Sequence, residues 1–201
     1  MLLACDSIGP IAIFVASKKI NHLRDAVRRT SQLANQLLAL SRADARSLDA
    51  QPLLRVDLKD LCETLLEAYL DAAEGKQIDL GLDVQAVHVD GHDWLLRELL
   101  CNLLDNALKY TPDGGVITLR CAPATMRSAP LLEVEDNGPG VPPAQRLRVL
   151  ERFYRVPGTA TEGNGLGLAI ANEIARVHRS ELVVDSGLNG QGTRVTLSFL
   201  P

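Results

Sequence analysis

The amino-acid sequence predicts an α/β protein, a two-layer sandwich in which a mixed β-sheet carries helices on one face. Segments in which apolar residues alternate, as in strands, are interspersed with segments that have the three-to-four-residue apolar spacing of helices. Their order does not follow a strict strand–helix–strand alternation, so a purely parallel sheet is not expected. The chain has 201 residues, of which 46% are hydrophobic and 3% aromatic, so its core is expected to be mainly aliphatic.

Composition narrows the class of function. The formal net charge is −4, so a broad electrostatic surface for nucleic acid is not expected. The longest apolar run near the start, residues 8–16, is far shorter than the roughly 20 residues that span a bilayer. We therefore expect a cytoplasmic protein with no membrane span in this chain. The four cysteines lack metal-binding spacing and are expected to be reduced: Cys5, Cys62, Cys101 and Cys121.

A long helix is expected before the sandwich. Residues 1–17 have no clear period and are not assigned to any structure. Residues 18–50 carry an apolar stripe with alternating steps of three and four, and this segment is locally basic. A single helix cannot bury such a stripe, so it must pack against another copy of the chain or against the next domain. Gln51 and Pro52 interrupt the pattern and mark a linker to a second domain, residues 53–201.

The first half of that domain combines short strands with two amphipathic helices. Residues 53–58 are expected to form a strand, and Asp57 can cap a following helix that runs to about Gly75. The next expected elements are strands over 78–82 and 87–90 and a helix over 93–110. The inward positions of the two helices are Leu58, Leu61, Leu65, Leu66, Tyr69, Leu95, Leu96, Leu99, Leu100, Leu103, Leu104 and Leu108.

The second half begins after a turn. Residues 112–115, Pro-Asp-Gly-Gly, have strong turn chemistry. The elements expected beyond it are strands over 116–121 and 131–135, a helix over 165–177, and strands over 181–186 and 193–200. The last two strands are joined across a glycine-containing turn, residues 187–192.

One helix carries a polar face between its leucines. Glu98, Asn102 and Asn106 recur every four residues and therefore lie on one side of the 93–110 helix. Amide oxygens suit a Mg²⁺ ion that keeps several waters and also binds phosphates. Lys109 can meet a phosphate as a point charge, while Tyr110 can stack on a purine or close the core. The alternative for each residue alone is an ordinary solvated helix face.

Two glycine-containing segments follow. Asp136 ends a strand and can accept a hydrogen bond from an exocyclic amino group, while Gly138 and Gly140 allow backbone to approach a ligand closely. The second segment places free backbone N–H groups at a helix start, a site suited to anions, through Gly163, Gly165, Leu166, Gly167 and Leu168. No strand is expected before it, which argues against a dinucleotide-binding unit. Taken alone, Asp136 and its glycines are also compatible with an ordinary turn.

The segment between the two loops, residues 151–155, holds two of the few aromatic residues, Phe153 and Tyr154. It is expected to anchor a lid that orders when a ligand binds. Arg152 or Arg155 is then available to phosphate oxygens.

Together these segments resemble the ATP-binding domain of sensor histidine kinases. Their N, G1, F and G2 boxes are similar to residues 98–111, 136–140, 151–155 and 163–168, and Gly192-Thr193 is similar to their terminal Gly-Thr. The resemblance covers about residues 53–201 and implies the Bergerat ATP-binding fold, which gyrase, certain chaperones and mismatch-repair ATPases share. The preceding segment, 18–50, resembles the second helix of the kinases' dimerisation and phosphotransfer domain.

The resemblance implies ATP and Mg²⁺ as cofactors. Asn106 would bind Mg²⁺, Asn102 and Lys109 the phosphate end, Tyr110 the adenine face and Asp136 the adenine amino group. The other ATP contacts that it implies are Gly138, Gly140, Arg155, Gly163, Gly165, Leu166, Gly167, Leu168 and Thr193. Glu98 would be the catalytic candidate, since it sits where hydrolytic relatives keep a general base; whether it acts as one here is open. The implied partners are a second copy of the chain, bound through residues 18–50, and a response regulator.

One departure from the family concerns the phosphoacceptor. The family's acceptor histidine is followed by Glu-Leu-Arg-Thr-Pro or a similar pattern on a first helix, which is expected to be missing or replaced by residues 1–17. No such pattern follows any histidine of the chain: His22, His88, His92 or His178. His178 stands where the family has a histidine before Gly-Gly, here Arg179-Ser180, and is expected to be structural.

The sequence therefore predicts the catalytic portion of a sensor histidine kinase whose acceptor histidine comes from another polypeptide. Two alternatives stay open. The first is a non-catalytic ATP-binding or dimerising module that regulates a kinase or a response regulator. The second is a Bergerat-type ATPase.

Overall fold

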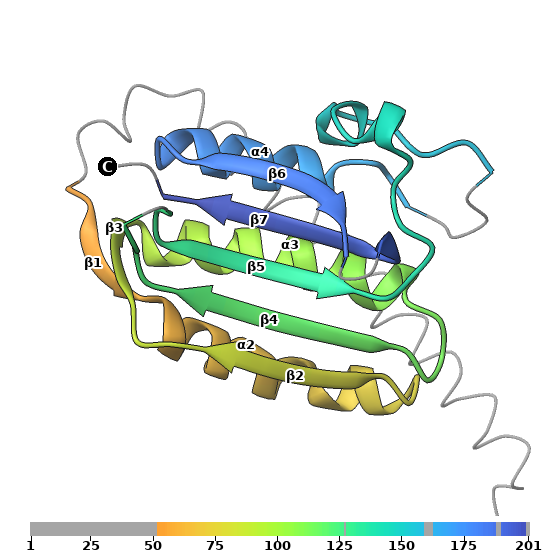
Figure 1. Cartoon of the computed structure of the whole chain (residues 1–201), viewed down its shortest axis with the longest axis horizontal. Coiled ribbons are helices and arrows are strands. Elements are labelled where there is room, and N and C mark those ends of the chain that lie inside the picture. Colours follow the sequence, from red (N-terminus) through yellow and green to blue (C-terminus); the bar gives the residue numbers. More distant parts are fainter. Residues whose placement is uncertain (1–51, 127, 159–162, 188–189, 200–201) are drawn as a thin grey trace, which may run out of the picture. The chain divides into compact units, whose positions relative to one another are not determined.

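The sheet and its helices form the two layers that the sequence predicts. The computed structural model describes residues 52–126, 128–158, 163–187 and 190–199. Within them a five-stranded mixed sheet carries three α-helices on one face (Figure 1). The predictions for residues 1–17 and 18–50, including the dimerisation helix, lie outside the described residues.

The strand order of the main sheet is β2-β4-β5-β7-β6. The strands are β2 (Asp79–Val84), β4 (Val116–Ala122), β5 (Leu131–Asp136), β6 (Glu181–Ser186) and β7 (Thr193–Ser198). β2 pairs with β4 in parallel, and the other pairs are antiparallel. A separate two-stranded antiparallel sheet joins β1 (Leu54–Asp57) to β3 (His88–Gly91). The expected strands are therefore present, with ends that differ by one or two residues.

The helices are α2 (Leu58–Glu74), α3 (Asp93–Tyr110) and α4 (Gly167–Val177). Asp57 caps α2 as predicted, because its Oδ1 accepts hydrogen bonds from the backbone N–H groups of Lys59 (2.9 Å) and Asp60 (3.3 Å). Two short 3₁₀ helices, η1 (Pro143–Gln145) and η2 (Arg148–Leu150), follow β5 in a segment without sequence period. Among the described residues no helix combines the length and apolar character that crossing a membrane requires.

Leucines of α2 and α3 pack against the inner face of the sheet. The largest fully buried side chains are Leu58, Leu61, Leu95, Leu96, Leu99, Leu100, Leu103, Leu104, Ile117, Leu119, Leu132 and Ile170. Burial of each such side chain contributes about 1.5–3 kcal/mol to the free energy of unfolding. Two of the predicted inward positions, Leu66 and Leu108, are only half-buried. Leu82 is 36% exposed, since β2 is the edge strand of the sheet.

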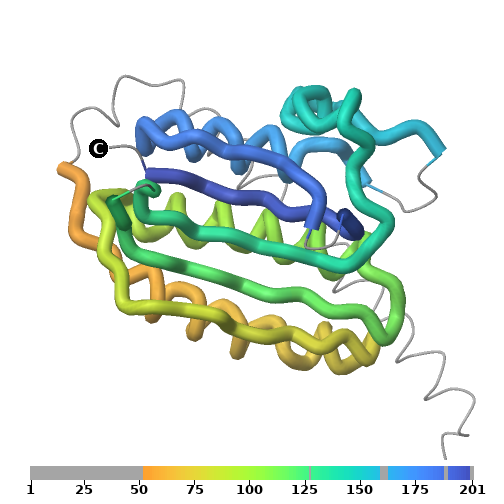
Figure 2. Tube along the Cα trace, in the orientation of Figure 1, coloured from red at the N-terminus to blue at the C-terminus, as the bar shows by residue number. Residues whose placement is uncertain are grey.

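Chain topology brings several element ends to one end of the sandwich. β5 ends there at Asp136, α3 ends at Tyr110, and α4 begins at Gly167, as the traces in Figures 1 and 2 show. Thr193 opens β7 at the same end, because it is the register partner of Asp136. The residues that the sequence singled out are thus collected by the antiparallel arrangement of the strands.

His178 is a buried structural residue, as expected. Its Nε2 accepts a hydrogen bond from the backbone N–H of His92 (3.0 Å), so its Nδ1 carries the proton and donates to the carbonyl of Ile174 (2.8 Å). Burial lowers the pKa of His178 below its ordinary value. The side chain therefore ties the start of α3 to the last turn of α4.

The next residue, Arg179, has a φ of +50°, in the left-handed region. A side chain there costs about 1–2 kcal/mol, and glycine avoids most of this cost. The resemblance described above implies glycine at this position. Arg179 therefore holds a backbone conformation that suits the family's residue better than its own.

Arg179→Gly is expected to raise the free energy of unfolding by about 0.5–1 kcal/mol, because relief of the left-handed strain exceeds the added entropy of the unfolded chain. Equilibrium unfolding in urea measures the change. The matched control is Arg176→Gly, inside the last turn of α4, which should lower the same quantity by about 1 kcal/mol. A destabilised Arg179→Gly protein would contradict the strain argument.

Candidate functional site

A cavity of about 540 Å³ opens where these element ends meet. Its walls come from α3, the start of α4, the ends of β5 and β7, and residues 139–158. Most of the residues that the sequence singled out line it: Asn106, Lys109, Tyr110, Asp136, Gly140, Arg155, Gly165, Leu166, Gly167, Leu168 and Thr193. Four other candidates for catalysis or ATP binding lie outside the lining, namely Glu98, Asn102, Gly138 and Gly163, and so do Arg152 and Phe153. Residues far apart in sequence are thus gathered around one space.

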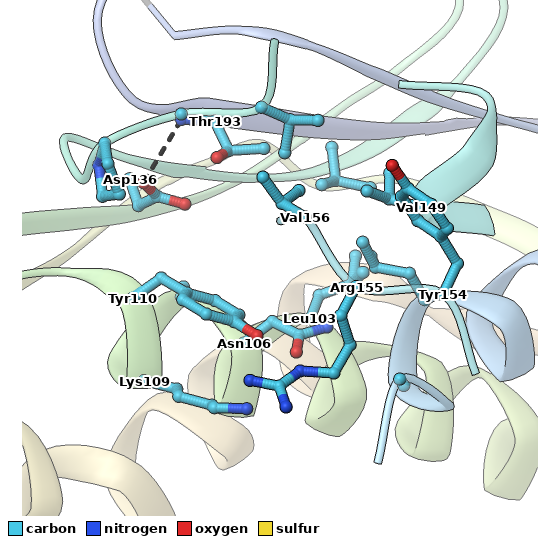
Figure 3. A pocket seen from close by; sticks show the side chains of 18 of the residues that line it. Leu103, Asn106, Lys109, Tyr110, Asp136, Val149, Tyr154, Arg155, Val156 and Thr193 are labelled. Carbon is cyan, nitrogen blue, oxygen red and sulfur yellow. Dashed lines mark hydrogen bonds between the residues drawn. The ribbon is translucent and has the colours of Figure 1, made fainter. Parts of the chain in front are cut away.

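A buried carboxylate forms one wall of this cavity. Oδ1 of Asp136 accepts hydrogen bonds from the backbone N–H groups of Gly138 (2.8 Å) and Thr193 (3.2 Å), the second of which is drawn in Figure 3. Burial raises the pKa of Asp136 above its ordinary value, and the bonds from Gly138 and Thr193 act in the opposite direction. Two backbone donors therefore hold the carboxylate in one orientation at the cavity wall.

Glycines allow three backbone segments to meet around Asp136. Gly192 has a φ of +72°, and a Cβ atom there would overlap the carbonyl oxygen of Asp136. Gly140 has a φ of +76°, and its Cβ would lie 2.7 Å from the carbonyl oxygen of Gly192. Gly138 does not line the cavity, but its Cβ would lie 2.9 Å from the carbonyl oxygen of Tyr110. Glycine at position 138 therefore lets the Asp136 loop pack on the end of α3, and glycines at 140 and 192 let the loop pack against the chain before β7.

The start of α4 packs against the polar face of α3. The amide nitrogen of Asn102, a residue only 3% exposed, donates to the backbone carbonyl (2.8 Å) and the carboxylate (3.3 Å) of Glu98. A Cβ on Gly167 would lie 3.1 Å from Asn106 Nδ2 and 3.4 Å from Asn102 Oδ1, so α4 packs closely on this face. Of the three polar residues, Asn106 alone lines the cavity. Burial raises the pKa of Glu98 above its ordinary value.

Positive charge gathers at the other end of the cavity. Figure 3 shows the side chains of Lys109 and Arg155 extending into the same region, on the side of Asn106 away from Asp136. The Lys109 ammonium also lies 4.8 Å from the centre of the Tyr110 ring. The positive end of the α4 dipole adds to this field, since Gly167 and Leu168 of its first turn line the cavity. This end therefore suits an anion.

The glycine loop before α4 is held against the neighbouring segments. The backbone N–H of Phe153 donates to the carbonyl of Gly165 (2.9 Å), and Gly165 has a φ of +68°. The N–H of Leu166 donates to Oδ1 of Asn164 (3.2 Å), so this one amide already has a partner inside the loop. Gly163 lies outside the lining, yet a Cβ on it would overlap Nζ of Lys109. The absence of a side chain at Gly163 therefore lets the loop approach the Lys109 ammonium closely.

The cavity lining also has an apolar section. It is formed by Leu103, Val134, Val149, Val156 and Val195, and such a section suits a flat, weakly polar ring. These residues were not predicted as site residues. The inward position of Val195 could have been predicted from the alternation of apolar residues in its strand. Val149 lies in η2, in a segment whose apolar residues follow neither a helix nor a strand spacing. Aliphatic residues look alike in a core and in a ligand cavity.

Comparison with known proteins gives a consistent picture. The sequence profile of the family described as histidine kinase-, DNA gyrase B- and HSP90-like ATPases matches residues 90–201. The chain is 38% identical over 177 residues to the sensor protein kinase PmrB of Pseudomonas aeruginosa, covering 88% of this chain and 36% of PmrB. It spans about a third of the length of the curated relatives that it matches.

Solved structures are similar as well. A mycobacterial sensor histidine kinase, MprB, superposes with a TM-score of 0.63 at 30% identity, over 73% of this chain and 96% of that one. Full-length ShkA in complex with AMPPNP superposes with a TM-score of 0.71 at 28% identity, over 90% of this chain and 38% of that one. Both similarities include the sandwich described above.

Gly192→Ala is expected to destabilise the chain far more than Gly190→Ala. Both glycines have a positive φ, +72° and +76°, but a Cβ on Gly190 meets nothing within 4 Å whereas one on Gly192 overlaps Asp136. Gly190→Ala should therefore cost about 1 kcal/mol, from strain alone. Gly192→Ala should cost at least about 2 kcal/mol more. Urea unfolding of the two variants compares them, and equal losses would show that the close approach to Asp136 is unimportant.

Proposed function

This chain belongs to the family of histidine kinase-, DNA gyrase B- and HSP90-like ATPases, and we propose that it is the ATP-binding catalytic part of a sensor histidine kinase. Its sandwich is the Bergerat ATP-binding fold of that family. The observation that carries the proposal is the polarity of the cavity, with the Asp136 carboxylate at one end and Lys109 and Arg155 at the other. The similarity to PmrB and MprB, both sensor kinases by name, supports it.

The acidic end binds the base. Asp136 accepts a hydrogen bond from the exocyclic amino group of adenine, and its buried position strengthens that bond because water is largely excluded. The valines of the apolar section contact the ring faces, and Tyr110 covers the base from α3. A guanine would present a carbonyl oxygen to this carboxylate, so the site favours adenine over guanine. Thr193 helps to hold the acid in place through its backbone N–H.

The cationic end binds the phosphates. Lys109 and Arg155 meet phosphate oxygens, and the backbone N–H groups at the start of α4 add further donors. Asn106 fits a Mg²⁺ ion, since one amide oxygen is enough for an ion whose other ligands are phosphates and water, and the ion would neutralise phosphate charge. Asn102 lies outside the lining and supports this end by seating Gly167 against α3.

The reaction is an in-line transfer. A histidine imidazole nitrogen attacks the γ-phosphorus of ATP, the bond to the bridging β–γ oxygen breaks, and ADP leaves. The chain contributes by holding the nucleotide in place and by balancing its charge. None of the four histidines stands in the family's acceptor pattern, so the acceptor is a histidine outside these 201 residues. The phosphoryl group then passes to a response regulator. In this proposal, residues 18–50 join two copies of the chain, which work on the cytoplasmic side of the membrane.

A hydrolytic role is less well supported. Steady ATP hydrolysis needs a base near the γ-phosphate to activate water. Glu98, the candidate for that base, does not line the cavity, and its carboxylate accepts a hydrogen bond from Asn102. The geometry therefore favours transfer over hydrolysis.

Calorimetric titration of MgATP into the full chain tests the binding step. We expect the wild-type chain to bind MgATP at a single site and to bind MgGTP little or not at all. In Asp136→Asn, MgATP binding should be at least about tenfold weaker, because a charged acceptor is lost. Asp113→Asn in the exposed turn before β4 is the matched control and should bind MgATP like the wild type. The absence of any MgATP binding to folded wild-type chain would refute the proposal.

Labelled ATP with Mg²⁺ and an added acceptor-histidine domain tests the transfer step. Label on the added domain alone is expected. Label on this chain itself would contradict the acceptor in trans, and bound nucleotide without any labelled protein would favour the non-catalytic module. Steady phosphate release that Glu98→Ala abolishes would favour the ATPase.

A further inference from the structure

Lys76 makes two hydrogen bonds that reach from α2 to the end of α3. It lies two residues beyond α2, and its Nζ donates to the carbonyl oxygens of Leu108 and Thr111, each at 2.7 Å. Its own backbone is fixed as well, since its N–H donates to Ala73 and its carbonyl accepts from Gly114. The backbone hydrogen bonds therefore fix the position from which the Lys76 side chain extends.

The Leu108 bond replaces one that the sequence of α3 cannot make. In a continuing helix the carbonyl of Leu108 would accept from the N–H of residue 112. That residue is Pro112, which has no N–H. Lys76 supplies the missing donor, and its positive charge is favourable beside the negative end of the α3 dipole.

The two acceptors bracket the residues that face the cavity. Leu108 immediately precedes Lys109, and Thr111 immediately follows Tyr110. Lys76 itself does not line the cavity. Its influence on a ligand must therefore pass through the backbone of Lys109 and Tyr110.

The end of α3 that Lys76 binds also contacts the loop that holds Asp136. The carbonyl oxygen of Tyr110 lies so close to Gly138 that a Cβ there would be 2.9 Å away, and the N–H of Gly138 donates to Asp136. A shift of the α3 end would therefore disturb both the cationic end and the Asp136 wall.

We propose that Lys76 is a positioning residue for the nucleotide site, which fixes Lys109 and Tyr110 by closing the end of α3 in place of the donor that Pro112 lacks. This inference rests on the proposed function, since it treats the cavity as the ATP site. Lys76 touches no ligand. Its effect is on the geometry of residues that do.

Lys76→Met keeps the apolar stem and removes both donors, and it is tested in the full chain. MgATP affinity is expected to fall by about tenfold or more, as two charge-assisted hydrogen bonds are lost. Lys76→Arg retains a charged donor and should restore affinity to within about threefold of the wild type. Lys59→Met is the matched control, since Lys59 is an exposed α2 lysine with one ion pair to Glu63 (3.7 Å), and it should bind like the wild type.

Two further measurements separate positioning from a general loss of stability. Leu65→Ala removes a buried side chain in the middle of α2 and should destabilise the fold without weakening binding to the folded protein. In nuclear magnetic resonance spectra of nucleotide-free Lys76→Met, the amide signals of Lys109, Tyr110 and Gly138 should shift, whereas in Leu65→Ala they should not. MgATP binding by Lys76→Met that equals wild-type binding, or that falls no further than in Leu65→Ala, would overturn the inference. A wild-type chain that does not bind MgATP would instead refute the proposed function, and this inference with it.

Discussion

The structure depends on the close backbone packing around Asp136. Gly192 and Gly140 let β7 and the loop after β5 approach each other, and Gly138 lets the same loop rest on the carbonyl of Tyr110. Because these contacts involve backbone atoms, they have little freedom to relax when a side chain is added. The acid and the end of α3 are therefore fixed relative to one another, and the distance between the two ends of the cavity is set by the fold.

A second close contact fixes the cationic end of the cavity. Gly167 places the first turn of α4 on the polar face of α3, against Asn102 and Asn106. The face that the sequence marks as polar thus does two things, since Asn106 reaches the cavity while Asn102 bonds within α3 to Glu98. Asn102 is tolerated there although it is buried, because its amide donates to Glu98, and such a bond is the usual condition for burying an amide.

Much of the fold and part of the site could be predicted because they depend on local rules. The leucine spacing located α3 with its observed bounds, and Asp57 was recognisable as a cap. Asp136 and its glycines are ordinary turn residues, and they could be recognised as a site only because the other segments of the family pattern accompany them. Three features had no local signal. Val149 is an aliphatic residue like those of any core. Glu98 lies outside the cavity lining although it shares a helix face with Asn106, and only the tertiary packing shows this. The hydrogen bond from Lys76 to Leu108 joins residues 32 positions apart in the sequence.

In the proposed function, one cavity binds adenine through Asp136 and holds the phosphates near Lys109. A crystal structure of the chain with a non-hydrolysable ATP analogue and Mg²⁺ tests it most directly. The account predicts the adenine amino group within hydrogen-bond distance of the Asp136 carboxylate, with the phosphates beside Lys109 and Arg155 and the ion at Asn106. An analogue bound in the opposite orientation, or at another place on the protein, would contradict it.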